Sequence, residues 1–219
     1  MRVTASKVGL LSLCQWWARP EAKWEARSSS EADRGTRFHR AIAAYINDGE
    51  IVDVGDDIRA EYEHARAWVD DARSFELPIR AEVAYAWDPA TDTAEEIQTD
   101  GERDYSRANG RLAGTADIVV VVPGAGCGYV FDWKTGDGTG AGPQLRSLAL
   151  MLARAHGLRW VRVTALEVRP DGIVEAVDEE LDEFDLSVIA GDLAEQIAAI
   201  EDAEPQPGSH CGELYCPAR

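Results

Sequence analysis

The residues with the clearest chemical potential are two aspartates and a lysine in a β-rich part of the sequence. Asp117 lies inside the run GTADIVVVV, and Asp132 lies inside YVFDWKTG. An ionised carboxylate in such apolar surroundings is costly unless a cation or a hydrogen-bond donor pairs with it. Lys134 follows Asp132 by two positions, so in a strand both side chains lie on the same face. A hairpin formed by the two runs would bring all three groups to one end of a sheet.

Two carboxylates beside an ammonium group suit a divalent cation and a phosphodiester. Mg²⁺ and Mn²⁺ prefer hard oxygen ligands, and the bound cation polarises a phosphate and activates water. Lys134 would orient the nucleophile or stabilise developing charge. An arginine would do this less well, because its guanidinium is delocalised and does not titrate usefully. The chain has 19 Arg and only 3 Lys, so a lysine at this position is informative. The alternative is a buried salt bridge between Asp132 and Lys134, with Asp117 as a turn or cap residue.

The surrounding sequence predicts the elements that would position this hairpin. Helical periodicity and stop signals predict helices from Ser6 to Trp17, from the residue after Ser28-Ser29-Ser30 to the Asn47-Asp48-Gly49 break, and over residues 56–75, 143–157 and 184–202. Alternation and β-rich composition predict strands over residues 79–87, 111–122, 128–136 and 158–168, a weaker strand over 172–177, and a turn near 123–128.

This order of elements predicts a mixed α/β (α+β) fold, with a central mixed sheet flanked by helices. The 219 residues suit one domain, with an N-terminal helical part (1–77), a catalytic sheet core (78–178), and a C-terminal helix with a cysteine-containing tail (179–219). No apolar run approaches the roughly 20 residues of a transmembrane helix, and the N-terminal apolar patch lacks a small-residue cleavage site. We therefore expect a cytoplasmic protein without membrane contact.

An ordered set of short motifs resembles a nuclease family. The motifs are Gly35-Thr36-Arg37-Phe38-His39, Glu82, Gly114-Thr115-Ala116-Asp117, Asp132-Trp133-Lys134-Thr135-Gly136 and Gln144. They follow the order of the RecB-like branch of the PD-(D/E)XK nuclease superfamily, which includes the CRISPR-associated RecB-like exonucleases, and the resemblance spans residues 35–148. It implies a restriction-endonuclease-like core with the hairpin at its centre, and Mg²⁺- or Mn²⁺-dependent cleavage of DNA.

The resemblance also implies a role for each matching residue of the metal site. Asp117 and Asp132 would be the metal-binding carboxylates, and Lys134 would be the catalytic lysine. The carbonyl of Trp133 would be a further ligand, and His39 would supply another from the preceding helix. Taken alone, His39 would more often be a satisfied histidine of the core.

Two other matching residues would position the DNA. Gln144 would lie near the site and help to hold the nucleic acid, although it could instead cap the helix after Pro143. Glu82 is either a DNA-positioning residue of the site or a solvated strand position. The sequence departs from the family at Leu148, where an aromatic residue, usually Tyr, is common, and this leaves the DNA contact of that helix open.

The cysteines form a second group of interest. Many relatives hold an iron–sulfur cluster with one Cys near the N-terminus and three near the C-terminus, and Cys14, Cys211 and Cys216 resemble three of these four. Cys127 lies in the predicted hairpin turn. Three interpretations remain: a longer native chain, a cluster or zinc site completed by a ligand such as His210, or free thiols. We favour free thiols or a degenerate site because three cysteines fall short of the usual cluster.

The favoured function is a metal-dependent deoxyribonuclease, and within that class an exonuclease that acts on DNA ends or single strands. The alternatives are a non-catalytic nucleic-acid-binding or assembly subunit and a hydrolase of another phosphate ester. A net charge of −18 argues against a broad DNA-binding surface, although a bound cation reverses the field that a phosphate meets. We therefore expect a narrow basic track and a partner protein in a defence, recombination or CRISPR complex. We expect Trp16, Trp17 and Trp24 to pack the N-terminal helices on the core. The alternative is that they stack on the bases of a single strand.

Overall fold

A six-stranded sheet with the order β2-β1-β3-β4-β5-β6 forms the centre of the protein. The computed structural model describes residues 3–19, 22, 29–97, 105–136, 138–206, 208 and 211. Strands β4 and β5 run parallel, whereas the other neighbouring strands run antiparallel. The mixed sheet with a central β3–β4 hairpin is therefore confirmed. The strands are β1 (Ile79–Asp88), β2 (Thr93–Ile97), β3 (Leu112–Val122), β4 (Cys127–Lys134), β5 (Trp160–Arg169) and β6 (Gly172–Asp182).

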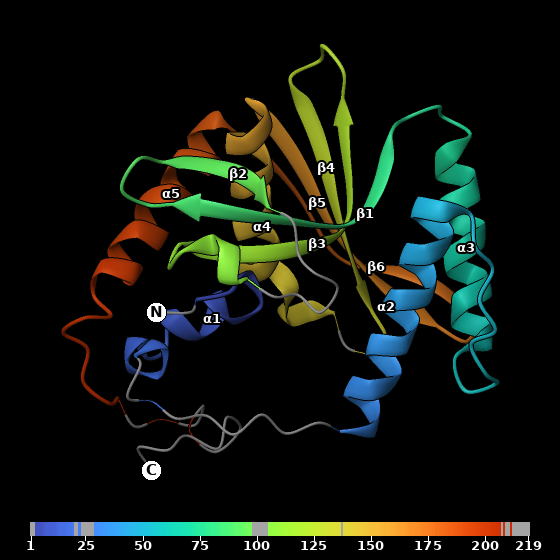
Figure 1. The fold of residues 1–219 in the computed structure, drawn as a ribbon, viewed down its shortest axis with the longest axis horizontal. Coiled ribbons are helices and arrows are strands. Elements are labelled where there is room, and N and C mark those ends of the chain that lie inside the picture. Colours follow the sequence, from blue (N-terminus) through green and yellow to red (C-terminus); the bar gives the residue numbers. More distant parts are fainter. Residues whose placement is uncertain are drawn as a thin grey trace.

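Helices cover both faces of this sheet (Figure 1). One face carries α2 (Ser30–Asp48) and α3 (Arg59–Arg73), and the other carries α4 (Gly142–His156), with α5 (Glu183–Ala198) and the short α1 (Val8–Leu11) packed beside it. Local signals fix the ends of α2. The Ser29 hydroxyl accepts a hydrogen bond from the Ala32 N–H at 3.1 Å, and Gly49 ends the helix at a φ of 71°. Single-turn 3₁₀ helices occupy Ala5–Lys7, Gln15–Ala18, Ser106–Ala108 and Thr139–Ala141.

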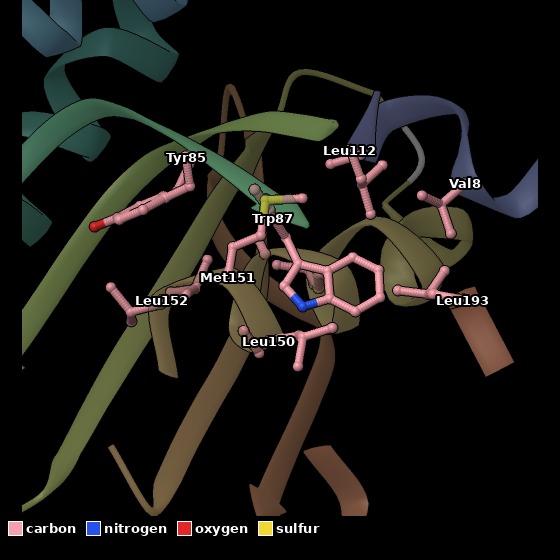
Figure 2. Close-up of a cluster of buried hydrophobic side chains, with 14 of the residues drawn as sticks. Val8, Tyr85, Trp87, Leu112, Leu150, Met151, Leu152 and Leu193 are labelled. Carbon is pink, nitrogen blue, oxygen red and sulfur yellow. The ribbon is translucent and has the colours of Figure 1, made fainter. Parts of the chain in front are cut away.

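The sheet separates two large hydrophobic cores, and β4 contributes to both. Val130 belongs to the core under α4 and α5, whereas Trp133 belongs to the core under α2 and α3. Figure 2 shows part of the α4 core, where the Trp87 indole lies among leucines of α4 and α5. Because side chains alternate along a strand, Asp132 and Lys134 share the face of Val130. The catalytic candidates on β4 therefore face α4.

One close approach holds the N-terminal segment against β3. A Cβ atom on Gly114 would lie 2.5 Å from the Ala5 Cβ and 2.9 Å from a Leu148 methyl group. We therefore expect Gly114→Ala to lower the free energy of unfolding by about 1–3 kcal/mol through overpacking. The matched control is Gly191→Ala in α5, where nothing lies within 4 Å, and it should raise stability by up to about 1 kcal/mol. Urea unfolding of both variants measures the difference, and equal effects would contradict the close packing.

Three elements differ from the sequence-based prediction. The single helix expected from Ser6 to Trp17 is wrong, because this segment forms two 3₁₀ turns around the short α1. Each short piece instead buries apolar side chains such as Leu11 and Trp17 in the α4 core, so tertiary packing overrides helical periodicity. Strand β2 was not predicted because its mostly exposed TAEEI sequence lacks alternation. Strand β6 extends beyond residue 177 to Asp182 as a polar edge strand.

Candidate functional site

The site forms where β3 and β4 separate from each other. Their pairing runs from Val122–Cys127 to Ile118–Phe131 and ends there, so Asp117 and Asp132 are the next residues at the open end. Asp117 is 4% exposed and Asp132 is 1% exposed. The Asp117 Oδ2 atom accepts a hydrogen bond from the backbone N–H of Trp133 at 2.8 Å. The Asp117 carboxylate thus accepts the hydrogen bond that a backbone carbonyl would accept in a continuous ladder. The two strands separate at this point but stay connected through that bond.

Asp132, Lys134 and Gln144 form a closed set of polar contacts at this fork. The Lys134 Nζ atom lies 2.6 Å from Asp132 Oδ2 and donates to Gln144 Oε1 at 3.3 Å. The amide nitrogen of Gln144 donates to Asp132 Oδ1 at 2.9 Å. Both ends of the amide are used, so Gln144 fixes the carboxylate and the ammonium relative to each other. It lies in the first turn of α4, but it makes these contacts rather than acting as the N-cap, which is Ala141.

A second group consists of His39, Glu82 and Asp117. One nitrogen or oxygen atom from each of these side chains lies within 4.8 Å of the others, and His39 Nδ1 lies 3.2 Å from Asp117 Oδ1. The three residues come from α2, β1 and β3. A glycine brings α2 close to the end of β4, because a Cβ atom on Gly35 would lie 3.3 Å from the Thr135 hydroxyl. His39 therefore reaches the fork from a helix docked directly on it.

The backbone of β1 is distorted at Glu82. This residue lies opposite Asp117 in the β1–β3 ladder, between two regular pairs, and its φ is 54°. Such left-handed values are rare for a residue with a side chain and cluster at functional sites. Ala81 belongs to the α2–α3 core and Val83 to the α4 core, so β1 changes the face that it presents at this point. The distortion places Glu82 half-buried in the site, while its DNA-positioning role stays a prediction.

The electrostatics of the fork disfavour a second ionised carboxylate. Burial and the nearby charge of Asp117 raise the pKa of Asp132 from 3.8 to about 6, against the opposing effect of the Lys134 ammonium. A cation at the fork would remove this penalty. The imidazole and carboxylate donors of His39, Glu82 and Asp117 fit a small divalent cation. The site can therefore hold a metal ion among His39, Glu82 and Asp117, while the Lys134 ammonium lies next to Asp132.

The raised pKa predicts how stability depends on pH in the metal-free protein. The folded state binds the Asp132 proton more tightly than the unfolded state. Protonation of Asp132 therefore favours the folded state fully below pH 3.8, and this contribution to the free energy of unfolding is lost as pH rises through about 6. From about pH 4.5 to about pH 7.5, we expect the ionisation of Asp132 to lower the free energy of unfolding by about 2 kcal/mol. Asp132→Asn should remove that loss. Urea unfolding with chelator at both pH values measures it, and equal pH dependence in both proteins would contradict the burial argument.

An interaction between helices supports the site and was missed in the sequence. Arg34 of α2 forms an ion pair with the buried Glu61 of α3, and it donates to the backbone carbonyl of Thr135 at 3.3 Å. It also donates to the carbonyl of Asp57 at 3.2 Å. Arg34 thus ties both helices to the chain just after Lys134. Its only sequence signal was its place next to the Gly35 motif.

Two of the sequence-based alternatives concerned helix α4 and the tryptophans. Leu148 is fully buried and packs at Gly114, so its side chain does not face a bound nucleic acid. Trp17 is buried in the α4 core, and Trp16 packs against the same core, which confirms the packing interpretation for these two. Trp24 lies outside the described residues.

The predicted cysteine site is described only in part. Cys14 is buried, Cys127 and Cys211 are half-buried, and none of these three forms a disulfide with another described residue. Cys216 and His210 lie outside the described residues. The cluster and zinc interpretations therefore stay predictions.

One comparison with known proteins identifies the family of this chain. A family model described as the PD-(D/E)XK nuclease superfamily matches residues 2–219. The solved structure of SSO0001 is 15% identical in sequence, with 96% of this chain and 95% of that chain covered and a TM-score of 0.36. No curated protein matches the chain. Within the described ranges, the helices are too short or too polar to cross a lipid bilayer.

Proposed function

The chain belongs to the PD-(D/E)XK nuclease superfamily, and we propose that it is a metal-dependent deoxyribonuclease of the RecB-like branch. We further propose that it acts as an exonuclease on DNA ends or single-stranded DNA. The observation that carries the proposal is the β3–β4 fork, where buried Asp117 and Asp132 lie with Lys134. A purely structural salt bridge would need Asp132 and Lys134 only, and it would not explain the second buried carboxylate beside them.

His39, Glu82 and Asp117 are the residues that would hold the metal ion, with Asp132 and the Trp133 carbonyl as further proposed ligands. When bound, a divalent cation polarises the phosphate and makes a water molecule more acidic. The backbone N–H of Trp133 fixes the direction of one Asp117 oxygen. The imidazole nitrogen and the carboxylates together favour Mn²⁺ over Mg²⁺, because Mg²⁺ binds nitrogen ligands less readily.

Lys134 is the group that we propose to act on the reacting atoms. Asp132 and Gln144 hold its ammonium, and the Lys134 side chain is 26% exposed, so a phosphate at the fork can reach it. There it would orient the attacking water and stabilise the negative charge that develops on the phosphate oxygens. Gln144 would keep the Lys134 ammonium in place, since the amide joins that group to Asp132. This gives Gln144 a positioning role in the reaction.

The RecB-like assignment is supported by the order of the motifs. The GTRFH motif of α2 precedes the hairpin, and Gln144 follows it on α4. The pathway that we propose is defence, recombination or a CRISPR complex in the cytoplasm, with a partner protein. The excess of acidic residues supports a contribution from a partner, since a net charge of −18 weakens DNA binding by the free chain.

The choice of DNA substrate tests this proposal. We expect purified protein with Mn²⁺ to degrade linear single-stranded or double-stranded DNA progressively from its ends and to leave closed circular DNA of the same sequence intact. Cleavage of the circle at an equal rate would replace the exonuclease with an endonuclease. Hydrolysis of a small phosphate ester without any cleavage of DNA would replace the nuclease with another phosphoesterase.

A further inference from the structure

An open apolar groove lies beside α3, on the α2–α3 face of the sheet. It has a volume of about 250 Å³ and is formed by α3, the residues that follow it, and β1, β3 and β4. Tyr129 and Phe131 form its floor on β4, whereas Lys134 ends the same strand at the fork. Phe131 immediately precedes Asp132 on β4 but packs against the α2–α3 core, so the groove lies on the opposite face of the sheet from Asp132 and Lys134.

The groove is aromatic and open to solvent. Trp68 of α3 packs edge-on against Phe131, with 4.9 Å between ring centroids, and Tyr129 packs in the same way on Trp160 at 5.6 Å. Phe75 lines the groove and is 69% exposed. Aromatic side chains that stay partly exposed around a hollow are typical of the anchor sites of protein interfaces.

The local backbone holds Phe75 in this exposed position. Helix α3 ends at Arg73, and the N–H of Phe75 still donates to the carbonyl of Ala72 at 3.3 Å. The next residue, Glu76, has a φ of 56°, which is unfavourable for a residue with a side chain. The chain thus adopts a strained turn that leaves a large apolar side chain in water, although burial would stabilise it by about 2 kcal/mol.

The charge around the groove is negative. Asp71 is the one charged residue in its lining, and the exposed Asp70 and Glu76 flank it in the sequence. Two basic side chains of this region are paired: Arg73 lies 3.7 Å from Asp70 and donates to the carbonyls of Tyr45 and Ile46, and Arg80 pairs with Glu96. Such a rim repels phosphates and attracts lysine and arginine.

We propose that this groove is a docking site for a partner protein, and that it takes a segment with bulky apolar side chains flanked by basic residues. The apolar side chains would fill the space between Trp68, Phe75 and Phe131, and the basic residues would pair with Asp71. The acidic rim favours a basic peptide over nucleic acid, whose phosphates would meet Asp71. This inference does not depend on the proposed nuclease activity.

A fluorescent model peptide provides the test. The probe is an amphipathic helix with Leu and Trp on one face and Lys on the other, and its control carries Glu in place of Lys. We expect the basic peptide to bind the full chain with a Kd of ~10 µM by anisotropy. Phe75→Ser and Asp71→Lys should each weaken binding at least about fivefold. The matched control is Phe184→Ser on α5, which removes an equally exposed Phe (74%) and should leave the affinity unchanged.

Four binding results would overturn the proposal. These are no binding of the basic peptide at about 100 times the expected Kd, equal affinity in all variants, equal affinity for the acidic peptide, and Phe75-dependent binding of an oligothymidine only. A Phe75-dependent dimer in sedimentation would assign the groove to a second copy of the chain and would also overturn it. DNA cleavage without peptide should be unchanged in Phe75→Ser, which separates this test from that of the nuclease.

Discussion

Replacing Lys134 by alanine is expected to lower the rate of DNA cleavage by about 10²–10⁴-fold. The ammonium contacts both Asp132 and Gln144, so its loss removes the proposed stabilisation of the reacting phosphate. The fold should persist, because Lys134 is partly exposed and its loss leaves Asp132 free to stay protonated near pH 6. The measurement is the single-turnover rate of cleavage of end-labelled linear DNA with saturating Mn²⁺.

Two further variants make the Lys134 prediction specific. Lys134→Arg should recover only a small part of the rate, because a guanidinium does not match the compact ammonium that Asp132 and Gln144 hold. Lys7→Ala removes the other lysine in the described part of the chain, which lies over the Trp17 ring at 5.9 Å, and it should cleave at the wild-type rate. Wild-type cleavage by Lys134→Ala would show that the chemistry takes place without this residue.

Asp117→Asn is expected to abolish both metal binding and cleavage. Asn keeps an oxygen that can accept the Trp133 N–H, so the fork should remain folded, but it removes the negative charge next to His39 and Glu82. We expect Mn²⁺ affinity by calorimetry to fall at least about 100-fold, since a neutral amide is a poor ligand for a divalent cation. The thermal stabilisation that Mn²⁺ gives the wild type should disappear with it.

The control for this variant is an acidic residue far from the fork. Asp192 is exposed on α5, and Asp192→Asn removes the same charge without touching the site. It should bind Mn²⁺ with wild-type affinity and show the same thermal shift. If Asp117→Asn kept its Mn²⁺ affinity while cleavage was lost, Asp117 would act on the substrate rather than on the metal.

Much of the site could be predicted because it depends on local patterns. The i, i+2 spacing of Asp132 and Lys134 places both on one face of any strand, and the turn that follows Val122 carries Gly124 and Gly126 at positive φ. The hairpin could therefore be predicted from the sequence. The fold class followed from the order of helices and strands, and the family match over residues 2–219 agrees with it.

The remaining features depend on contacts between distant segments. The left-handed backbone of Glu82 carries no glycine or asparagine signal, and it arises where β1 changes the face that it presents opposite Asp117. The Arg34–Glu61 ion pair joins two helices. The groove lies where α3 ends at Arg73, beside Phe131 and Tyr129 of β4. None of these could be read from periodicity, since each depends on where one element ends against another.

The most direct test of the central claim is the cleavage of linear DNA by the wild-type protein as a function of added divalent cation. After treatment with a chelator, the protein should be inactive, and Mn²⁺ should restore cleavage with a saturation curve that follows its affinity in calorimetry. Mg²⁺ should restore cleavage at higher concentration. Undiminished cleavage in excess chelator, or no cleavage with either cation while both bind, would contradict a metal-dependent nuclease at the β3–β4 fork.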